Sequence, residues 1–462
     1  MLIPSGFSWI PKLLIVLACC VPPLYFCLSR LTTPSSSSSP SSLYCPISPL
    51  SNDVQLVLKT TATEVLSNLP VHLETTLRCV PNYLIYSDHA ESLAGIPIHD
   101  ALSSLPNILN SPRPEFALHN HLHAHGRAGL NTTTPLNTTS ARTLAKWKTI
   151  PTLHDVLHRR PTAKWFVFID LDTYIVWPNL LAYLARFDAR KPWYITQRAH
   201  RGTRPQVFAN SGAGYALSAP AVRKMLAHVR AHRKSFEKLI ESEWGADVLL
   251  YQALKDVGVE LFSAFPHFQG AAPPGLDLNA TQIGRRPWCY APVSYGHMRP
   301  EERRALWEFE QEWDRRHEGS GRVLRHRDVF KGLVLPQIPA VRRGWDNMVG
   351  WRTEYSEEVF RQLTYKEWWN LEQEEQEAYF SFSQCRALCE SLASCRQYAY
   401  AVGRCDISGG LTLGYEREKG ETWDDSQMPE ITSGWVMKRL PEYVEKMDSS
   451  CEGEDGNGWV TT

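Results

Sequence analysis

The segment Lys164–Asn179, KWFVFIDLDTYIVWPN, constrains the fold of this chain more than any other. Trp165–Ile169 is an uninterrupted apolar run, which favours a strand buried on both faces, as in a parallel sheet covered by helices. Asp170 and Asp172 follow this run directly. Alternate residues of a strand point to the same side, so we expect both carboxylates to converge at the carboxyl end of the strand, where open α/β sheets bind ligands.

Two neighbouring carboxylates repel each other, and a hard divalent cation such as Mg2+ or Mn2+ would keep both ionised. The cation also has free coordination positions that phosphate oxygens can occupy. Asp170 and Asp172 therefore predict the metal and diphosphate chemistry of nucleotide-sugar enzymes. The alternative is that both are ordinary turn or capping residues, because a single Asp-x-Asp pattern has little specificity.

The composition limits the class of protein. The 462 residues suffice for two folded units. Lys and Arg together number 49, as do Asp and Glu, and no basic block stands out. A nucleic-acid-binding surface needs an excess of positive charge, so we expect no nucleic-acid partner.

An apolar, uncharged segment, Leu13–Leu28, lies near the amino terminus. With the residues before it, this segment provides a membrane span of roughly 20 residues. A cleavable signal peptide is the alternative, although no clear small-x-small cleavage site follows. We predict a cytoplasmic tip over 1–8, a transmembrane signal anchor over 9–30 and a flexible Ser/Pro-rich stem over 31–50.

Three Asn-x-Thr patterns predict N-glycosylation at Asn131, Asn137 and Asn279, which requires a secretory lumen. Eight of the 11 cysteines lie beyond the apolar segment, a number that suits an oxidising compartment. We therefore expect a single membrane span with the folded part of the chain in the lumen.

The folded part begins with a predicted βαβ unit: a strand over Val54–Lys59, a helix around Glu64–Leu77 and a strand over Asn82–Tyr86. Polar residues follow the strand ends, where the base and ribose of a nucleotide could be held, although helix capping explains them equally well. These candidate donor-binding residues are Thr60, Thr61 and Asp88.

Residues 105–142 are rich in Asn, Pro, Thr and His, and we interpret them as a surface insertion. The HNHLHAH run within them could bind zinc if it were extended. Metal sites usually draw their ligands from separate elements, so we favour a solvated loop. The histidines of the run are His119, His121, His123 and His125.

Two further segments follow the Asp-x-Asp strand and the helix expected over Asn179–Phe187. In NSGAGYALS, Gly212 and Gly214 allow the backbone to approach a ligand closely. In WGADVLLYQALK, Asp247 lies at the positive amino end of a predicted helix over Val248–Lys255. Asp247 is a helix cap or, if the fold brings it opposite Asp172, a general base.

The segment PWCYAPVSYGHM ends near His297, a histidine that either completes a metal site or has a structural role. Together, these segments resemble glycosyltransferase family 31, the fringe-like and core-1-galactosyltransferase-like group of β-1,3-glycosyltransferases, particularly its fungal members. The resemblance rests on the order of VLKTT, YLIYSD, KWFVFIDLDTYIVWPNLLAYL, NSGAGYALS, WGADVLLYQALKDVGV and PWCYAPVSYGHM and covers Asp53–Pro300.

The resemblance implies a GT-A fold over 51–345, with a Rossmann-like mixed sheet flanked by helices. It also implies a type II Golgi anchor, a UDP-sugar donor and Mn2+ or Mg2+. Asp170 and Asp172 would bind the metal and donor, with Asp172 as the direct metal ligand, and Asp247 would be the base of an inverting displacement. The chain departs from the family pattern at Tyr251, where a glycine is usual, and at Gly296, which stands where the metal-binding histidine aligns.

His297 lies one place later, and a one-residue bulge would bring it back into the metal site. In the carboxyl-terminal third, Glu301–Arg316 predicts a charged helix. The later segment FSFSQCRALCESLASCRQYAYAVGRC resembles a PAN/Apple module, a small disulfide-rich α+β domain over 346–462 that binds protein or carbohydrate. This second resemblance implies nested disulfides, Cys385 with Cys405 and Cys389 with Cys395.

No suitably spaced histidine joins those four cysteines, which argues against a zinc site. Four other cysteines allow three pairings that the sequence leaves open: Cys45, Cys79, Cys289 and Cys451.

The function expected from the sequence is a Golgi β-1,3-glycosyltransferase, N-acetylgalactosaminide β-1,3-galactosyltransferase-like, that acts on a glycan or glycoprotein acceptor. The alternative is a membrane-anchored glycan-binding protein on a catalytically impaired transferase scaffold. A purely structural secretory protein would leave the ordered acidic residues unexplained. The sequence does not choose the donor sugar, the acceptor or the oligomeric state.

Overall fold

The computed structural model describes residues 43–45, 47–105, 113–130, 138–200, 207–282, 284–348, 350, 352–417, 430–451 and 458–461. The predicted cytoplasmic tip, the anchor and most of the stem lie outside these ranges, as do Asn131 and Asn137. Within the ranges, no helix has both the length and the apolar character needed to cross a membrane. Cys45–Thr462 form one compact unit.

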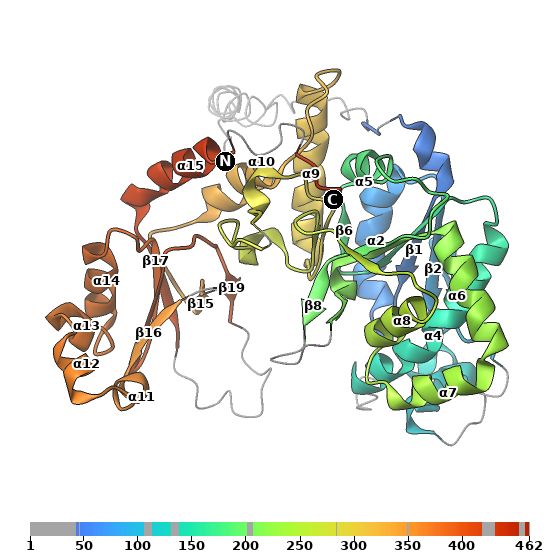
Figure 1. Ribbon diagram of the computed structural model, residues 1–462, viewed down its shortest axis with the longest axis horizontal. Coiled ribbons are helices and arrows are strands. Elements are labelled where there is room, and N and C mark those ends of the chain that lie inside the picture. Colours follow the sequence, from blue (N-terminus) through green and yellow to red (C-terminus); the bar gives the residue numbers. More distant parts are fainter. Residues whose placement is uncertain are drawn as a thin grey trace, which may run out of the picture. The chain divides into compact units, whose positions relative to one another are not determined.

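The first part of this unit is built on an eight-stranded sheet (Figure 1). Its central pairs are parallel, whereas β10 is antiparallel to both of its neighbours and β3 is antiparallel to β4. In spatial order the strands are β11 (Leu261–Ser263), β7 (Tyr194–Thr196), β10 (Tyr215–Ser218), β5 (Trp165–Asp170), β1 (Val54–Lys59), β2 (Tyr83–Ser87), β4 (Ile96–Asp100) and β3 (Glu91–Leu93).

Both faces of this sheet are buried, and strand β5 shows how. Phe166 and Phe168 pack into the core on one face, whereas Val167 and Ile169 pack into the core on the other. The alternation follows from the two-residue period of a strand. It confirms the prediction of a mixed sheet flanked by helices. The covering helices are α4 (Thr138–Arg159), α6 (Ala219–Ala231), α7 (Arg233–Ser242) and α8 (Ala246–Lys255) on the first face and α2 (Val65–Glu74) and α5 (Trp177–Leu184) on the second.

A three-stranded sheet of short strands lies beside the end of β5. In it, β13 (Ser294–Tyr295) pairs with β12 (Phe268–Gln269) on one side and with β6 (Tyr174–Ile175) on the other. Helix α9 (Pro300–Arg316) follows, as predicted, and packs Leu306 onto this sheet's tyrosines. The small sheet therefore joins the chain just after Asp172 to the chain just before α9.

A second, antiparallel sheet of five strands lies in the carboxyl-terminal third. Helix α14 (Phe382–Ser391) packs on it through Cys385 and Cys389, which are bonded to Cys405 and Cys395 in the predicted nested pairing. In spatial order the strands are β14 (Val341–Arg343), β20 (Thr432–Trp435), β17 (Gln397–Ala401), β18 (Arg404–Ser408) and β16 (Thr353–Ser356).

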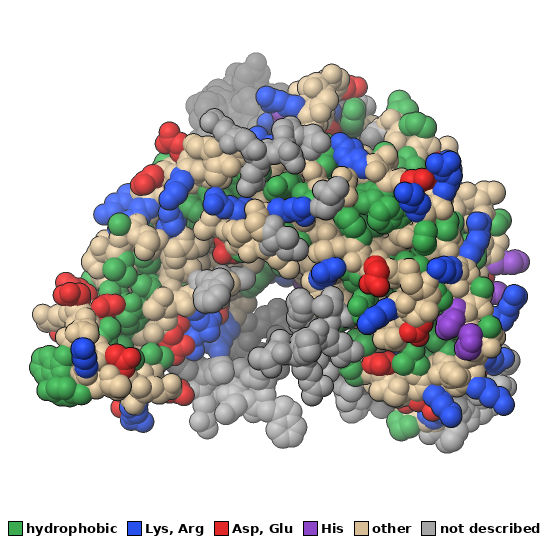
Figure 2. Space-filling view, in the orientation of Figure 1, with side chains coloured by type: hydrophobic (Ala, Val, Ile, Leu, Met, Phe, Trp, Pro, Cys, Tyr) green, Lys and Arg blue, Asp and Glu red, His purple; other side chains and the backbone are tan. Residues whose placement is uncertain are grey.

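This part also contains the helices α10 (His326–Val329), α11 (Glu357–Phe360), α12 (Tyr365–Trp369), α13 (Gln373–Glu377) and α15 (Leu440–Ser449). One apolar cluster crosses the predicted boundary between the two domains, because it contains both Trp288 and Trp435, and Trp288 contacts the ring of Tyr443. The disulfide Cys289–Cys451 reinforces this contact, and Cys45–Cys79 is the other pair that the sequence left open. Positive and negative side chains are interspersed over the face shown in Figure 2.

The interpretation of residues 105–142 as a loop is wrong in part. The histidine run lies in helix α3 (Ala117–His125), where Leu118 and Leu122 pack against Ala62. Apolar residues four apart fall on one face of a helix, and that contact outweighs the polar composition of the segment. His119 is buried on the same side, and its Nε2 lies 3.2 Å from Asp100 Oδ2, so this histidine belongs to a packed element.

The two disulfides Cys289–Cys451 and Cys389–Cys395 should contribute unequally to stability. Their sequence separations are 162 and 6 residues, respectively. On the chain-entropy estimate, the long loop stabilises the fold by about 5 kcal/mol and the short loop by about 2 kcal/mol. Paired Cys→Ser substitutions, compared by urea denaturation with tryptophan fluorescence, measure this difference. Equal losses of stability would contradict it.

Candidate active site

The carboxyl ends of β1 and β5 form the floor of the candidate site. Lys59 and Asp170 are direct neighbours across the parallel pair, and Lys59 Nζ lies 3.1 Å from Asp170 Oδ1. The ammonium also stands over the ring of Tyr215, 5.2 Å from its centroid. Burial alone would lower the pKa of Lys59, but the charge of Asp170, with smaller contributions from Tyr215 and Asp247, outweighs it and raises that pKa. Lys59 therefore holds a positive charge beside Asp170.

Asp172 lies in a turn rather than on the strand. Strand β5 ends at Asp170, and the backbone N–H of Thr173 donates to the Asp170 carbonyl at 3.0 Å. The expectation that both carboxylates share one strand face is therefore wrong, although the two remain close. Burial first and then the charge of Asp170 raise the pKa of Asp172, while His297 and Arg303 oppose this shift.

His297 reaches the same point from the small sheet. Continuing the antiparallel register of β13 with β6 brings His297 opposite Asp172, and the N–H of Met298 donates to the Asp172 carbonyl at 2.8 Å. His297 Nδ1 lies 2.5 Å from the Gly270 carbonyl oxygen. A carbonyl can only accept, so Nδ1 carries a proton, and in the neutral ring Nε2 is the nitrogen with the lone pair.

The backbone explains why the histidine stands at 297 rather than 296. A Cβ at Gly296 would lie 2.1 Å from the carbonyl oxygen of Gly212, so no side chain fits there. His297 adopts a left-handed φ of 51°, which turns its ring toward Gly212. A Cβ at Gly212 would in turn lie 2.8 Å from His297 Cε1. The left-handed backbone at His297 thus places its ring beside Asp172, and position 296 is occupied by glycine because no other residue fits there.

Asp247 approaches from helix α8, in its first turn, as predicted. Burial is the main reason that its pKa is raised; Lys59 lowers it, Asp170 raises it, and hydrogen bonds from Ser211 lower it. Lys59 thus interacts electrostatically with both Asp170 and Asp247. These three residues, from three segments of the chain, form one charged cluster.

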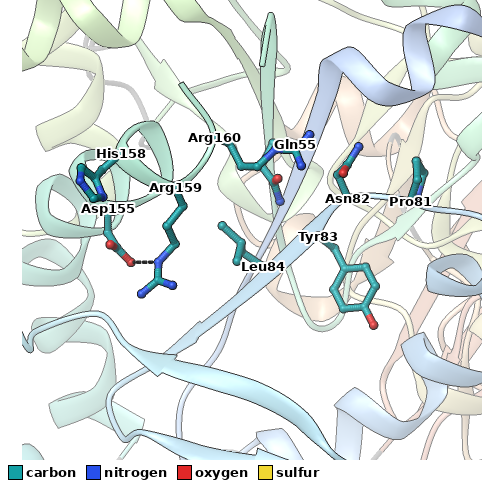
Figure 3. Close-up of a pocket in the computed structure, with 9 residues that line it drawn as sticks. All are labelled: Gln55, Pro81, Asn82, Tyr83, Leu84, Asp155, His158, Arg159 and Arg160. Atoms are coloured by element: carbon teal, nitrogen blue, oxygen red, sulfur yellow. Dashed lines mark hydrogen bonds and ion pairs between the residues drawn. The ribbon is translucent and has the colours of Figure 1, made fainter. Parts of the chain in front are cut away.

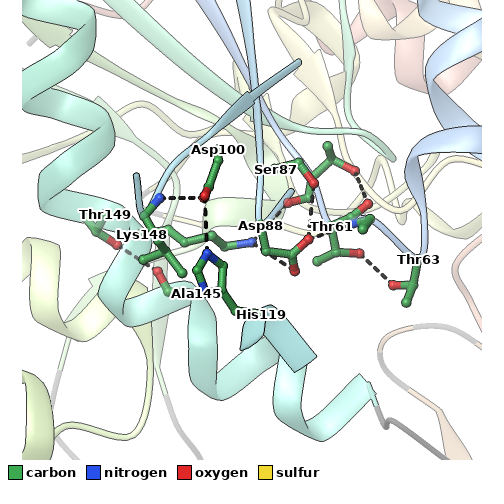
Figure 4. A network of polar contacts seen from close by, with 12 residues as sticks. Thr61, Thr63, Ser87, Asp88, Asp100, His119, Ala145, Lys148 and Thr149 are labelled. Atoms are coloured by element: carbon green, nitrogen blue, oxygen red, sulfur yellow. Dashed lines mark hydrogen bonds and ion pairs between the residues drawn. The ribbon is translucent and has the colours of Figure 1, made fainter. Parts of the chain in front are cut away.

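The predicted donor-binding residues at the other strand ends make local contacts (Figure 4). Asp88 is buried, and its Oδ1 accepts from the N–H of Ala62 at 2.7 Å. Lys148 donates to the carbonyl of Thr60 at 3.0 Å and has its Nζ 3.9 Å from Asp88 Oδ2. Thr61 shares a 2.7 Å hydrogen bond with Thr63. Asp88 therefore stabilises the turn after β1. Helix capping was the expected alternative to donor binding, but the N-cap residue of α2 is Glu64 and no side chain caps this helix.

The two glycines of NSGAGYALS have different roles. Gly212 accommodates the ring of His297, as described above. Gly214 has a φ of +74°, and a Cβ there would lie 3.1 Å from both Ile169 Cγ2 and the Phe168 carbonyl. Gly214 thus lets the chain pack tightly against the end of β5. At both glycines an added Cβ would meet neighbouring atoms.

Sequence reasoning missed three charged residues of this region. Lys59 could have been found, because it is the last residue of a predicted strand, and open α/β sheets bind ligands at the carboxyl ends of their strands. Glu64, which precedes α2, has its pKa raised by burial and by the charges of Asp170 and Asp172. Arg303 gave no signal, since it is one of several arginines on a charged helix.

Arg303 is fully buried beneath the acidic turn. Its guanidinium donates to the carbonyl of Leu171 and, at 2.6 Å, to Asn68 Oδ1. Burial lowers its pKa to about 10, and Asp172 opposes that shift. Arg303 therefore fixes the backbone between the two acidic residues of the Asp-x-Asp pattern.

The described residues hold no group of three or more His, Cys, Asp and Glu side chains arranged as a metal site. The donor types nevertheless suit the predicted cation, because carboxylate oxygens and one imidazole are ligands for Mn2+. The bond from His297 Nδ1 to Gly270 is also typical of metal-ligating histidines, which donate their second ring N–H to a carbonyl. Asp170 is the poorest fit, because Lys59 occupies one of its oxygens.

Residues 119–298 match the model of the Fringe-like family. The match includes Asp170, Asp172, Asp247 and His297 and begins within helix α3. Over these residues the chain is similar to the Fringe-like family, and this similarity points to a glycosyltransferase with the GT-A fold.

Gly296 should tolerate no side chain. We expect Gly296→Ala to reduce the free energy of unfolding by about 1–3 kcal/mol or more, because the added methyl meets backbone that no rotamer change can move. Gly245→Ala is a matched control, since a Cβ there meets nothing within 4 Å and φ is −153°. Thermal and urea denaturation measure both, and equal effects would contradict the argument.

Proposed function

We propose that this chain is a type II membrane β-1,3-glycosyltransferase of the Golgi, which transfers galactose from a UDP-sugar to a glycan or glycoprotein acceptor. One observation supports this proposal most directly. Asp170, Asp172, Asp247 and His297 come from three separate segments, interact at the carboxyl end of one sheet, and all lie within the Fringe-like match.

The proposed reaction is a single inverting displacement. The acceptor hydroxyl oxygen attacks the anomeric carbon on the face opposite UDP; the new C–O bond forms as the bond to the diphosphate oxygen breaks, and the electron pair leaves with UDP. Asp247 takes the hydroxyl proton. Its raised pKa makes its carboxylate a stronger base than that of an exposed aspartate. No covalent enzyme intermediate is needed.

Asp172 and His297 are the residues that would hold Mn2+ or Mg2+, with Asp170 on the donor side. When bound, such an ion stabilises the negative charge of the departing diphosphate. Lys59 places a fixed positive charge at the same strand end, 3.1 Å from Asp170. We infer that Lys59 restrains Asp170 and thereby leaves Asp172 as the direct ligand.

The cellular setting and the second module belong to the same proposal. Asn279 is exposed, as a glycosylation site must be, and the four disulfides suit an oxidising lumen. The nested disulfides and the antiparallel sheet of the carboxyl-terminal third support a PAN/Apple-like module. Such a module would recruit the acceptor.

UDP release by the purified chain tests the transferase. Offered a panel of UDP-sugars with Mn2+, the chain should release UDP fastest from UDP-galactose, and chelator, Asp172→Ala or His297→Ala should abolish that release. Asp247→Asn should lower the rate by about 10²–10⁴-fold, the usual contribution of a general base. Asp256→Asn, an exposed change at the other end of the same helix, should leave the rate unchanged.

The outcomes separate the two hypotheses. No release from any donor, together with no binding of UDP by calorimetry, would reject the enzyme and favour the impaired, glycan-binding scaffold. Release that survives Asp172→Ala and Asp247→Asn would place the reaction elsewhere in the chain.

The pH dependence should report Asp247. The pKa of Asp247 is raised above the ordinary 3.8, so its carboxylate becomes protonated at a higher pH than that of an exposed aspartate. As the pH falls through this raised pKa, the base is protonated and kcat/KM falls. Lys59 lowers this pKa, so Lys59→Met should move the acidic limb to still higher pH. Lys59→Arg keeps the charge and should leave the limb nearly in place. A limb that moves to lower pH in Lys59→Met would contradict the assignment.

A further inference from the structure

The carboxyl-terminal part of the chain exposes three large aromatic rings outside the candidate active site. Tyr365 and Trp369 lie one turn apart on helix α12 and are 79% and 63% exposed. Residues four apart share one face of a helix, and the centroids of these two rings are 5.8 Å apart. Phe380, between α13 and α14, is 59% exposed. These three residues form the aromatic patch, and Figure 2 shows hydrophobic side chains gathered where Figure 1 places α12.

Part-buried rings connect the members of the aromatic patch. Phe360 contacts both Trp368 and Tyr379, with ring centroids 5.0 and 5.3 Å apart. Trp368 is the sequence neighbour of Trp369. Tyr379 contacts Phe380, at 4.5 Å between centroids. The exposed rings therefore rest on one small aromatic core, and contiguous exposed apolar surface of this kind is typical of an interaction site.

The segment that carries the aromatic patch is strongly acidic, although the charges of the whole chain balance. Residues 357–377 contain seven glutamates and two basic residues. Within the part of the chain that the structure describes, Glu357 is the only one of these glutamates in an ion pair, with Arg361. The side chains of Glu358 and Glu374 have neither an ion pair nor a hydrogen bond there. The negative charge beside the patch is therefore largely uncompensated.

Charged residues elsewhere on the surface pair with one another. In the open pocket shown in Figure 3, Arg159 Nε lies 2.7 Å from Asp155 Oδ2, and Tyr86 donates to the same carboxylate at 2.7 Å. Helix α9 likewise pairs Glu312 with two arginines. The uncompensated charge of residues 357–377 is thus a local property of that segment.

Simpler explanations account for parts of this surface. A single exposed aromatic ring is common in soluble proteins. Glutamates in the first turn of a helix interact favourably with its dipole, and Glu358, Glu367 and Glu374 have such positions. Neither explanation accounts for three exposed rings and several uncompensated carboxylates within residues 357–380.

We propose that the aromatic patch docks a lysine- or arginine-rich segment of a partner protein. A cationic head group is attracted to the face of a Trp or Tyr ring, and the uncompensated glutamates add ion pairs of complementary charge. The alkyl stem of the same side chain covers the exposed ring. A neutral glycan could stack on the rings but would leave the carboxylates without a cation, and they would repel an acidic glycan. This docking does not depend on the proposed transferase activity.

Fluorescence anisotropy of a labelled peptide, titrated with the full purified chain, tests this assignment. The probe is a peptide that alternates arginine with glycine. Peptides that alternate lysine or glutamate with glycine are the references, and labelled lactose represents a neutral glycan. We expect both basic peptides to bind and the glutamate peptide and lactose not to bind. Binding should weaken as sodium chloride is added, because salt screens ion pairs at an exposed surface.

Variants then locate the site. Tyr365→Ala combined with Trp369→Ala should weaken binding of the arginine peptide by about tenfold or more, the usual effect of removing central aromatic residues from an interface. Glu358→Lys combined with Glu374→Lys should also weaken it, because this change reverses the local charge and keeps both rings. Thermal denaturation shows whether each variant is folded, and the lysine variant serves if the alanine variant is not.

Two changes elsewhere are matched controls and should leave binding unchanged: Leu66→Ala, at an exposed apolar residue of α2, and Glu318→Lys, at an exposed glutamate after α9. Three results would overturn the proposal: no binding of either basic peptide by the unaltered chain, equal binding of the arginine peptide by the alanine variant and the controls, or lactose binding that the alanine variant loses. The last result would make the patch a glycan-binding surface. UDP release is measured without these peptides, so failure of one proposal leaves the other standing.

Discussion

The structure depends most on the parallel pairing of β1 with β5. Both strands are buried on two faces, so neither can slip by one residue without moving apolar side chains to the wrong core. The fixed register brings Lys59 beside Asp170 at the point where the strands end. The same pairing that stabilises the core therefore sets the charge of the candidate site.

Backbone contacts position the rest of the site. Gly212, Gly296 and His297 lie so close together that each excludes a larger or differently placed neighbour. Arg303 fixes the acidic turn from below, through the carbonyl of Leu171. The proposed general base, on a separate helix, then completes the cluster, because Asp247 interacts with both Lys59 and Asp170. Such a site can tolerate a histidine one position later in the sequence than the family pattern has it, provided that the backbone there turns the ring toward Asp172.

The carboxyl-terminal third has a sheet and two disulfides of its own, yet it shares an apolar cluster and the Cys289–Cys451 bond with the first part. The Cys289–Cys451 bond holds this part at a fixed position relative to the segment that leads into the small sheet, since Cys289 lies five residues before β13 begins at Ser294. This covalent link is a physical reason to expect that the proposed acceptor recruitment and the proposed catalysis are coupled.

The sequence by itself determined the large elements. An apolar run of the correct length predicts β5, and acidic residues after a strand predict a ligand-binding site at the end of the sheet. These are local signals, and β5, α8 and α9 followed them. The nested disulfides followed the resemblance to a PAN/Apple module instead. Only the tertiary structure decided the Lys59–Asp170 pair, the turn at Asp172, the helix at the histidine run and the pairing of the other four cysteines. Each of these depends on which distant residues meet, and that is fixed by sheet register and core packing rather than by any local pattern.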